Sequence, residues 1–410
     1  MIEYGLLGKK IEHSFSPIIH KQFGDYRYEL IEKNEKEIDS FLREKSFKGI
    51  NVTHPYKKKA REYCDYIDET AKATDCVNTI LNKSGKLYGY NTDYYGFLYM
   101  FNKIKIEIEQ PKVLIVGDGA TSNVVKTALS NLNYVNIKVV SRKGLYNFHH
   151  TDYFSDTNIL INCTPLGIFP HEYDDYPVNI EKLQQLKIVI DLNYNPLRTK
   201  LLLNAKEQNC DICSGLLMLI AQAKKSSEIF QTKSISDKVV DQLHRKMKKE
   251  LSNIVFIGMP GSGKTTIGRL IAKRMNREFI DTDEEIRKSQ GKEPAKIIID
   301  EGEERFRELE KTIIKRDLMT FQKVISVGGG AVEGAENRNY MRFNSIVILL
   351  KRNLQNLDIE GRPLSLEGVE KLFAKRKKYY YALSDGVVEN NEIESTVEKV
   401  IQLYETVTNN

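Results

Sequence analysis

The sequence predicts an α/β protein with largely parallel sheets. Three observations indicate this class. Short apolar runs alternate with segments of helical periodicity along almost the whole chain. Of the 410 residues, 41% are hydrophobic, which is enough to build cores and too many for a disordered chain. No run of 18 apolar residues occurs, so no helix is expected to cross a membrane.

The expected strands are the short apolar runs, which lie in chain order at 4–8, 26–31, 49–53, 113–117, 136–141, 158–162, 187–191, 253–258, 324–327 and 345–350. Helical patterns lie between most of them, and 216–249 is predicted to form one or two helices without a strand. A new apolar strand then begins at Asn253. These changes predict four segments: 1–102, 103–215, 216–249 and 250–410.

Composition excludes several classes of function. The net charge is +6, from 62 basic and 56 acidic side chains that are mostly interleaved, so no nucleic-acid partner is expected. The N-terminus lacks an apolar signal core, which predicts a cytoplasmic protein. The five cysteines are sparse and odd in number, and we interpret them as ordinary thiols even though Cys210 and Cys213 form a CxxC pair.

The strongest motif is GMPGSGKT at residues 258–265, which matches GxxxxGK[ST] in full. It lies between an apolar strand and a helical pattern, as this motif requires. Its glycines let backbone N–H groups surround phosphate oxygens. Lys264 is expected to reach the β- and γ-phosphates of ATP, and the Thr265 hydroxyl is expected to bind Mg²⁺.

Further motifs follow in a fixed order: Asp281-Thr282-Asp283, Gly302-Glu303, Phe306-Arg307 with Glu310, Gly328-Gly329-Gly330, Arg362-Pro363-Leu364, and Arg376 with Tyr380. Each is weak alone. Together with the phosphate loop, across nearly the whole of 252–408, they closely resemble shikimate kinase. The segment 353–361 is shorter than the corresponding lid of that family, and one of its arginines is missing.

This resemblance implies a P-loop domain, similar to nucleoside monophosphate kinases, that phosphorylates the 3-hydroxyl of shikimate. Asp283 would orient and deprotonate the hydroxyl. The catalytic set would also include Lys264 and the lid residue Arg362. The implied ATP ligands are Gly258, Gly261, Ser262, Gly263, Lys264, Thr265, Thr266 and Arg362. The implied shikimate ligands are Asp283, Arg307, Gly329, Gly330 and Arg376, and the implied magnesium ligands are Thr265 and, through water, Asp281.

The N-terminal block offers polar motifs at strand ends. Ser14 and Ser16 can face one ligand from an extended segment, or can cap a helix before Pro17. Lys57 follows the rigid turn at Pro55, although an isolated lysine is usually a solvated surface residue. Gly117-Asp118-Gly119 opens a strand-to-helix turn, and the basic residues after Ser141 favour a 2′-phosphate, hence NADP over NAD.

In order, the motifs HSFSP, NVTHPYK, VNT, NTD, GDG, NCTPLG, DLNYNP and GLLML with Gln222 resemble shikimate dehydrogenase over residues 2–235. The resemblance implies a substrate domain and a Rossmann-like NADP domain. Lys57 would protonate the carbonyl oxygen, and Asp93 would hold that lysine. The implied substrate ligands are Ser14, Ser16, Thr53, Asn78, Asn91, Asp93, Tyr194 and Gln222, and the implied NADP ligands are Gly117, Gly119, Ala120, Ser141, Arg142, Lys143, Thr164 and Gly215.

Asp118, Ala120 and Lys21 depart from the dehydrogenase pattern, and Asp118 would lie awkwardly near a pyrophosphate. The composite interpretation is a bifunctional enzyme of aromatic amino-acid biosynthesis. It would reduce 3-dehydroshikimate with NADPH and phosphorylate the shikimate formed with ATP and Mg²⁺. Its partners would be these small molecules. Three alternatives remain: a quinate/shikimate dehydrogenase, a P-loop kinase for another small polyol, and one block acting only as an inactive scaffold.

Overall fold

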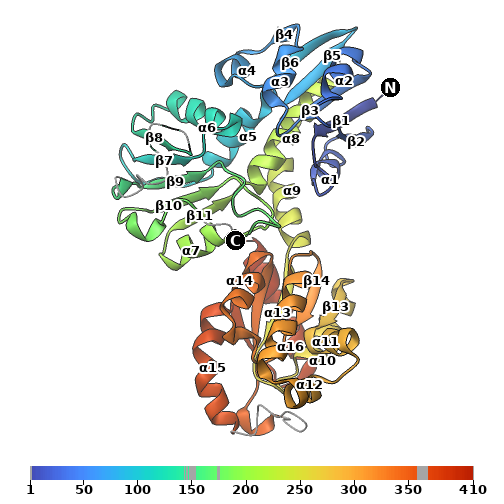
Figure 1. The fold of residues 1–410 in the computed structure, drawn as a ribbon, viewed down its shortest axis with the longest axis vertical. Helices are drawn as coiled ribbons and strands as arrows, with labels where there is room; N and C mark the ends of the chain where they lie inside the picture. The colour runs from blue at the N-terminus through green and yellow to red at the C-terminus, as the bar shows by residue number, and fades with distance from the viewer. Residues whose placement is uncertain are drawn as a thin grey trace. The chain divides into compact units, whose positions relative to one another are not determined.

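The computed structural model describes residues 2–142, 144, 146, 154–172, 176–357 and 368–409 (Figure 1). The chain divides into two compact units. The first comprises Met1–Tyr194 with Asn204–His244, and the second comprises Asn195–Leu203 with Arg245–Asn410. The second unit therefore includes a short segment from the first half of the sequence. The finer division at residues 102, 215 and 249 stays a prediction.

The first unit begins with a mixed sheet of order β2-β1-β3-β5-β6-β4. Its strands are β1 Ile2–Gly8, β2 Tyr28–Glu32, β3 Phe47–Val52, β4 Tyr66–Ile67, β5 Thr79–Lys83 and β6 Lys86–Tyr90, and its helices are α1 Ser16–His20, α2 Ile38–Glu44, α3 Lys57–Glu62, α4 Glu69–Thr74 and α5 Thr92–Phe101. The pairs β1–β2, β1–β3 and β4–β6 are parallel as expected, whereas β5 pairs antiparallel with both β3 and β6. Ser84 and Gly85 have φ of 54° and 85°, which is the tight reversal that joins antiparallel neighbours.

The second sheet of this unit is parallel throughout, with order β11-β10-β9-β7-β8. Its strands are β7 Val113–Val116, β8 Ile137–Val140, β9 Ile159–Asn162, β10 Ile188–Asp191 and β11 Asp211–Ser214, with helices α6 Ala120–Asn131 and α7 Lys200–Glu207. The chain leaves β7 toward one side of the sheet and returns to its other side at β9. Ligands of such sheets bind at the carboxyl ends of the strands beside this reversal.

The sheet of the second unit is also parallel, with order β13-β14-β12-β15-β16. Its strands are β12 Asn253–Ile257, β13 Glu278–Asp281, β14 Lys323–Ser326, β15 Ser345–Lys351 and β16 Gly386–Glu389. The helices are α10 Lys264–Met275, α11 Thr282–Gln290, α12 Pro294–Glu301, α13 Glu303–Leu318, α14 Ala335–Phe343, α15 Val369–Leu383 and α16 Ile393–Asn409, and short 3₁₀ turns are η3 Ala331–Glu333 and η4 Leu354–Asn356. Apolar side chains of β12 and β15 are buried against α10 and α16 and fix the core.

All ten predicted strands are present, and 216–249 forms helices α8 Leu216–Gln231 and α9 Asp237–Glu250 as expected. The sequence patterns missed β4, β5, β6, β11, β13 and β16, which are short or carry polar residues. In the part of the chain that the structure describes, no helix combines the length and the apolar character that crossing a membrane requires.

Helix α8 begins where the chain passes very close to the end of β10. A Cβ atom on Gly215 would lie 2.0 Å from the carbonyl oxygen of Leu192. We therefore expect Gly215→Ala to destabilise the first unit by about 1–3 kcal/mol, because the backbone must move to accept a methyl group. Thermal unfolding without cofactor measures this. Gly119→Ala is the matched control, since a Cβ there meets nothing within 4 Å; equal losses in both variants would contradict the prediction.

Candidate functional site

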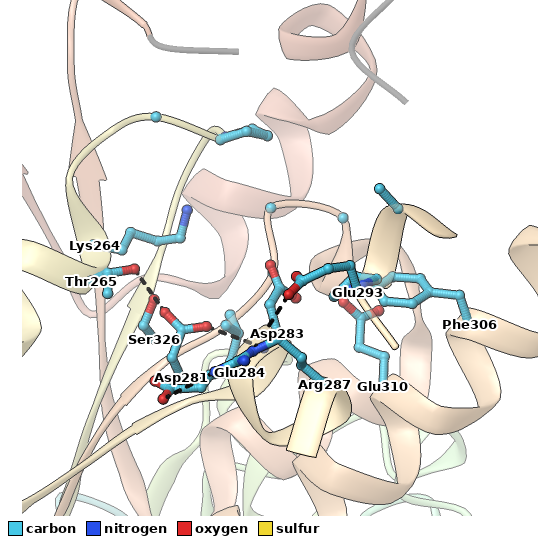
Figure 2. Close-up of a pocket in the computed structure, with 18 of the residues that line it drawn as sticks. Lys264, Thr265, Asp281, Asp283, Glu284, Arg287, Glu293, Phe306, Glu310 and Ser326 are labelled. Atoms are coloured by element: carbon cyan, nitrogen blue, oxygen red, sulfur yellow. Dashed lines mark hydrogen bonds and ion pairs between the residues drawn. The ribbon is translucent and has the colours of Figure 1, made fainter. Parts of the chain in front are cut away.

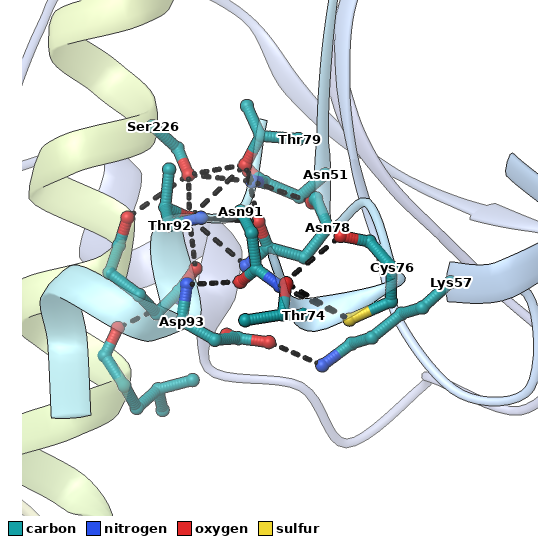
Figure 3. A network of polar contacts seen from close by, with 12 residues as sticks. Asn51, Lys57, Thr74, Cys76, Asn78, Thr79, Asn91, Thr92, Asp93 and Ser226 are labelled. Atoms are coloured by element: carbon teal, nitrogen blue, oxygen red, sulfur yellow. Dashed lines mark hydrogen bonds and ion pairs between the residues drawn. The ribbon is translucent and has the colours of Figure 1, made fainter. Parts of the chain in front are cut away.

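In the first unit, Lys57 and Asp93 form a short ion pair (Figure 3). The Lys57 Nζ lies 2.6 Å from Asp93 Oδ2, and their side chains are 17% and 11% exposed. Lys57 begins α3, and Asp93 lies in the first turn of α5. The α5 N-terminus stabilises a carboxylate there, and the Asn91 cap accepts a hydrogen bond of 3.1 Å from the Asp93 amide. The structure thus brings together the two residues of the predicted catalytic pair.

The protonation state of Lys57 follows from two opposing effects. Burial lowers the pKa of Lys57, but the charge and hydrogen bond of Asp93 outweigh it, so the pKa lies above its ordinary value. The lysine therefore carries its proton at neutral pH and can donate it.

The predicted substrate ligands Asn78 and Asn91 lie beside this pair and bond to protein groups. Asn91 Nδ2 donates to Thr74 Oγ1 at 2.7 Å and to the Cys76 carbonyl at 3.2 Å. Asn78 Oδ1 accepts a bond of 2.7 Å from the Thr92 amide. These bonds hold both amides rigidly, so any substrate contact would be made by side chains that are already oriented.

Sequence reasoning missed the buried residue that links this network to α8. Ser226 Oγ accepts from Asn51 Nδ2 at 2.7 Å and bonds Thr92 Oγ1 at 2.9 Å (Figure 3). Predicted Gln222 lies one helical turn earlier, and its Oε1 accepts from Thr92 Oγ1 at 3.4 Å. The i,i+4 spacing of Gln222 and Ser226 was the available signal, because it places two polar groups on one face of α8.

The remaining predicted substrate ligands lie near the starts of α1 and α3. Ser14 Oγ donates to Ser16 Oγ at 3.1 Å. Between them, the ring of Phe15 contacts that of Tyr194, with centroids 5.6 Å apart. Ser14 Oγ also accepts a bond of 3.2 Å from the Ser16 amide at the start of α1, so this serine takes part in the helix start as well. Thr53 lies just after β3, where its amide donates to the Leu7 carbonyl.

The predicted NADP site is the turn after β7. Gly117 has φ of 105°, and a Cβ there would lie 3.0 Å from Thr164 Cγ2, so a larger residue would be strained. Gly119 opens α6 at Ala120, and this helix N-terminus with open space around it fits a pyrophosphate. Asp118 Oδ2 accepts a bond of 2.9 Å from Ser141 Oγ, which keeps an acid close to this site.

Three other predicted NADP ligands lie around the same strand ends. Arg142 is exposed just after β8. Thr164 follows β9, and its amide and hydroxyl both donate to Asn162 Oδ1, at 2.9 and 2.6 Å. Gly215 begins α8. Lys143 lies outside the described residues.

In the second unit, a cavity of about 670 Å³ brings together the predicted kinase motifs (Figure 2). Its lining includes Gly261, Gly263, Lys264, Thr265, Thr266, Asp281, Asp283, Arg307, Glu310, Gly328, Gly329, Gly330 and Arg376. Gly258 lies at the start of the phosphate loop, and Ser262 is buried within it. Arg362 falls outside the described residues.

The phosphate loop has the shape that a nucleotide requires. Gly258 and Gly263 have φ of 143° and 91°, which side chains other than glycine rarely tolerate. Lys264 Nζ donates to the carbonyls of Gly258 and Met259, both at 3.0 Å. The lysine is thereby held over its own loop, where a phosphate would lie.

The predicted magnesium ligands also meet. Thr265 Oγ1 donates to Asp281 Oδ2 at 2.7 Å, and Asp281 caps α11. Among the described residues, no group of three or more His, Cys, Asp or Glu could hold a metal ion. A hydroxyl with one carboxylate fits Mg²⁺, which takes its other ligands from water and nucleotide phosphates.

Two acids face each other across Gly328. A Cβ there would lie 2.7 Å from Glu310 Oε1 and 3.0 Å from Asp283 Oδ1. Glu310 also pairs with Arg307 at 2.8 Å, and its side chain is fully buried. Burial raises the pKa of Glu310 to about 7, despite the opposing charge and hydrogen bond of Arg307. The site therefore contains one carboxyl group that titrates near neutrality.

Arg376, from α15, is almost completely buried and lines the same cavity. Its Nε donates to Glu333 Oε1 at 2.8 Å. One turn later, Tyr380 donates to the Gly329 carbonyl at 2.6 Å. Glu333 was missed from the sequence, because a lone acid after a glycine run gives no motif.

Two family models match separate parts of the chain. The family model described as shikimate dehydrogenase substrate binding domain matches residues 6–80, and that described as shikimate kinase matches residues 260–405. The shikimate dehydrogenase (NADP(+)) of Clostridium beijerinckii is 36% identical over 266 residues, covering 60% of this chain and 98% of that protein.

Solved structures resemble the same part of the chain. Shikimate dehydrogenase 1 from Peptoclostridium difficile is 32% identical, with a TM-score of 0.57, covering 60% of this chain and 98% of that one. Shikimate 5-dehydrogenase from Thermus thermophilus, in complex with NADP(H) and shikimate, is 25% identical, with a TM-score of 0.53, covering 60% of this chain and 99% of that one.

The raised pKa of Glu310 predicts a pH-dependent contribution to stability. Between about pH 4.5 and 7 the folded carboxyl binds more protons than the unfolded one, so its contribution to the free energy of unfolding falls as pH rises. In Glu310→Gln this decrease should disappear, which calorimetry of the full chain at about pH 5 and 7.5 would detect as a flatter slope for the second unit. Glu308→Gln, on an exposed position of the same helix, is the control; a slope unchanged in Glu310→Gln would refute the assignment.

Asp118 predicts a weakened affinity for the dinucleotide, because its charge opposes the pyrophosphate. Asp118→Asn keeps an acceptor for Ser141 and removes the charge, so we expect the KM for NADPH to fall about threefold, with a smaller difference at high salt. The KM for the carbonyl substrate should not change. Asp118→Glu retains the charge and serves as the control, and an unaltered NADPH KM in Asp118→Asn would argue against this electrostatic effect.

Proposed function

Because the chain belongs to the shikimate dehydrogenase family and also contains a shikimate kinase domain, we propose that it catalyses two consecutive reactions. The first unit reduces 3-dehydroshikimate to shikimate with NADPH. The second phosphorylates the 3-hydroxyl of shikimate with ATP and Mg²⁺. We also propose a cytoplasmic location, supported by five cysteines that are all free thiols.

In the proposed reduction, Gly117, Gly119 and Arg142 would hold NADPH, which when bound would supply the hydride of the new C–H bond. Lys57 gives its proton to the carbonyl oxygen as that oxygen gains negative charge. Asp93 keeps the ammonium protonated and directed, as the 2.6 Å pair and the raised lysine pKa support. The serine hydroxyls at 14 and 16 and the amides near Asp93 would bind the ring hydroxyls and the carboxylate.

In the proposed phosphorylation, Asp283 accepts the proton of the substrate hydroxyl. That oxygen bonds to the γ-phosphorus as the bond to the β–γ bridging oxygen breaks, and ADP leaves. Lys264 meets the phosphate charge, while Arg307 and Arg376 bind the substrate carboxylate. Mg²⁺ would neutralise phosphate charge when held at Thr265 and Asp281.

The kinase assignment rests on one observation, which is that the phosphate-binding loop, the proposed base and the proposed carboxylate-binding arginines line one cavity. The phosphate loop, the proposed base Asp283, and the arginines Arg307 and Arg376 all line it. Arg307 and Arg376 fit an acceptor that carries a carboxylate, because a guanidinium group binds a carboxylate through two parallel hydrogen bonds. The direct test supplies 3-dehydroshikimate, NADPH, ATP and Mg²⁺ to the purified chain and detects shikimate 3-phosphate by mass spectrometry.

The two activities should be separable by mutation. Lys57→Ala should lower NADPH-dependent reduction at least about 100-fold, because the proton donor is lost. Its shikimate phosphorylation should stay within about twofold of the wild type, since Lys57 and the kinase cavity belong to different units of the chain. Lys264→Ala should lower shikimate phosphorylation and leave NADPH-dependent reduction unchanged, because without the lysine no cation compensates the phosphate charge at that position. Initial rates with NADPH and with ATP measure both.

Exposed neighbours give matched controls for these variants. Lys58→Ala and Lys273→Ala remove lysines from the same helices but from exposed positions, and both rates should remain at the wild-type level. If Lys57→Ala or Lys264→Ala kept its own reaction near the wild-type rate, the role assigned to that residue would be wrong. Loss of both activities in either variant would contradict their independence.

A further inference from the structure

The turn η3 follows directly after the glycines that face the cavity. The Glu333 amide donates to the Gly330 carbonyl at 3.0 Å. From α14, Arg338 Nη1 donates to the carbonyls of Val332 and Glu333, both at 2.9 Å. The backbone at Glu333 is therefore fixed relative to the glycine run.

The carboxylate of Glu333 joins this turn to α15 through two cations. Oε1 accepts from Arg376 Nε at 2.8 Å, and Oε2 lies 2.6 Å from Lys375 Nζ. The Arg376 side chain is 4% exposed and that of Lys375 is 66% exposed. Solvent consequently screens the ion pair between Glu333 and Lys375, whereas the ion pair between Glu333 and Arg376 is largely shielded from water.

The hydrogen bond from its Nε to Glu333 restricts the rotation of the Arg376 guanidinium group. A guanidinium group binds a carboxylate through a planar fork, so its rotation decides whether two parallel hydrogen bonds form. With Nε directed to Glu333, the Nη end is the part that can meet a carboxylate in the cavity. Tyr380, one turn after Arg376, donates a hydrogen bond to the Gly329 carbonyl, so the glycine run is bonded to the same helix as Arg376.

We propose that Glu333 is a positioning residue for the second unit, which orients Arg376 and sets it in register with the glycines that contact the same substrate. The inference rests on the proposed shikimate kinase function. It assigns to a residue outside the cavity the control of affinity for the substrate carboxylate.

Two conservative variants of the full chain separate geometry from charge. Glu333→Asp keeps the charge but withdraws the acceptor by one methylene, so the KM for shikimate should rise about tenfold. Glu333→Gln keeps the length and the acceptor and loses the charge, so its KM should stay within about threefold of the wild type. In both, the KM for ATP and the rate of NADPH-dependent reduction should be unchanged. Lys375→Ala, which removes only the exposed partner, should match the wild type.

A double-mutant cycle with Arg376→Ala completes the test. If Glu333 acts through Arg376, Glu333→Asp should add almost nothing in that background. If Glu333→Asp and Glu333→Gln both raised the KM for shikimate, effects that are not additive with Arg376→Ala would also support the proposal. Unchanged KM in both variants, a loss in Glu333→Gln alone, or additive effects with Arg376→Ala would each overturn it. If the wild-type chain did not phosphorylate shikimate at all, the proposed function would fail before this inference was reached.

Discussion

A charged group that leaves water must find a partner, and this constraint organises both sites of the chain. Lys57 is tolerated in its half-buried position because Asp93 lies 2.6 Å away. In the second unit, Arg307 and Arg376 each have a glutamate partner. Each pair needs both partners, because removing one partner leaves a buried charge without compensation and destabilises the protein. They fix side chains that would otherwise turn toward solvent.

The sequence predicted the parts of the molecule that depend on local pattern. Apolar runs predicted the buried parallel strands, and glycine-rich turns predicted the phosphate loop, where φ of 143° at Gly258 excludes most other residues. The antiparallel pair β5–β6 was missed although Ser84-Gly85 carried the signal for its turn. Ser226 and Glu333 were missed for another reason: each acts through a partner far away in sequence, and one sequence alone does not show which distant residues meet.

The two sites use different chemistry for what we propose is the same ring acid. Around Lys57 the polar side chains are mostly neutral, and many are bonded to one another through Ser226 and Thr92. Around Asp283 the side chains are mostly ionic. This difference matches the reactions: one adds a hydride and a proton to a neutral carbonyl, whereas the other moves a highly charged phosphoryl group and needs compensating charge close by.

The ammonium group of Lys264 bonds to two carbonyls of its own loop. These contacts keep the loop in a preformed shape. When a nucleotide binds, its phosphate oxygens replace the two carbonyls as partners of Lys264, so the lysine contributes to the binding free energy only the difference between the two sets of bonds. A ligand without phosphates has no oxygens that could replace these two carbonyls as partners of the lysine. Selectivity for a nucleoside triphosphate over the free nucleoside would thus arise at Lys264.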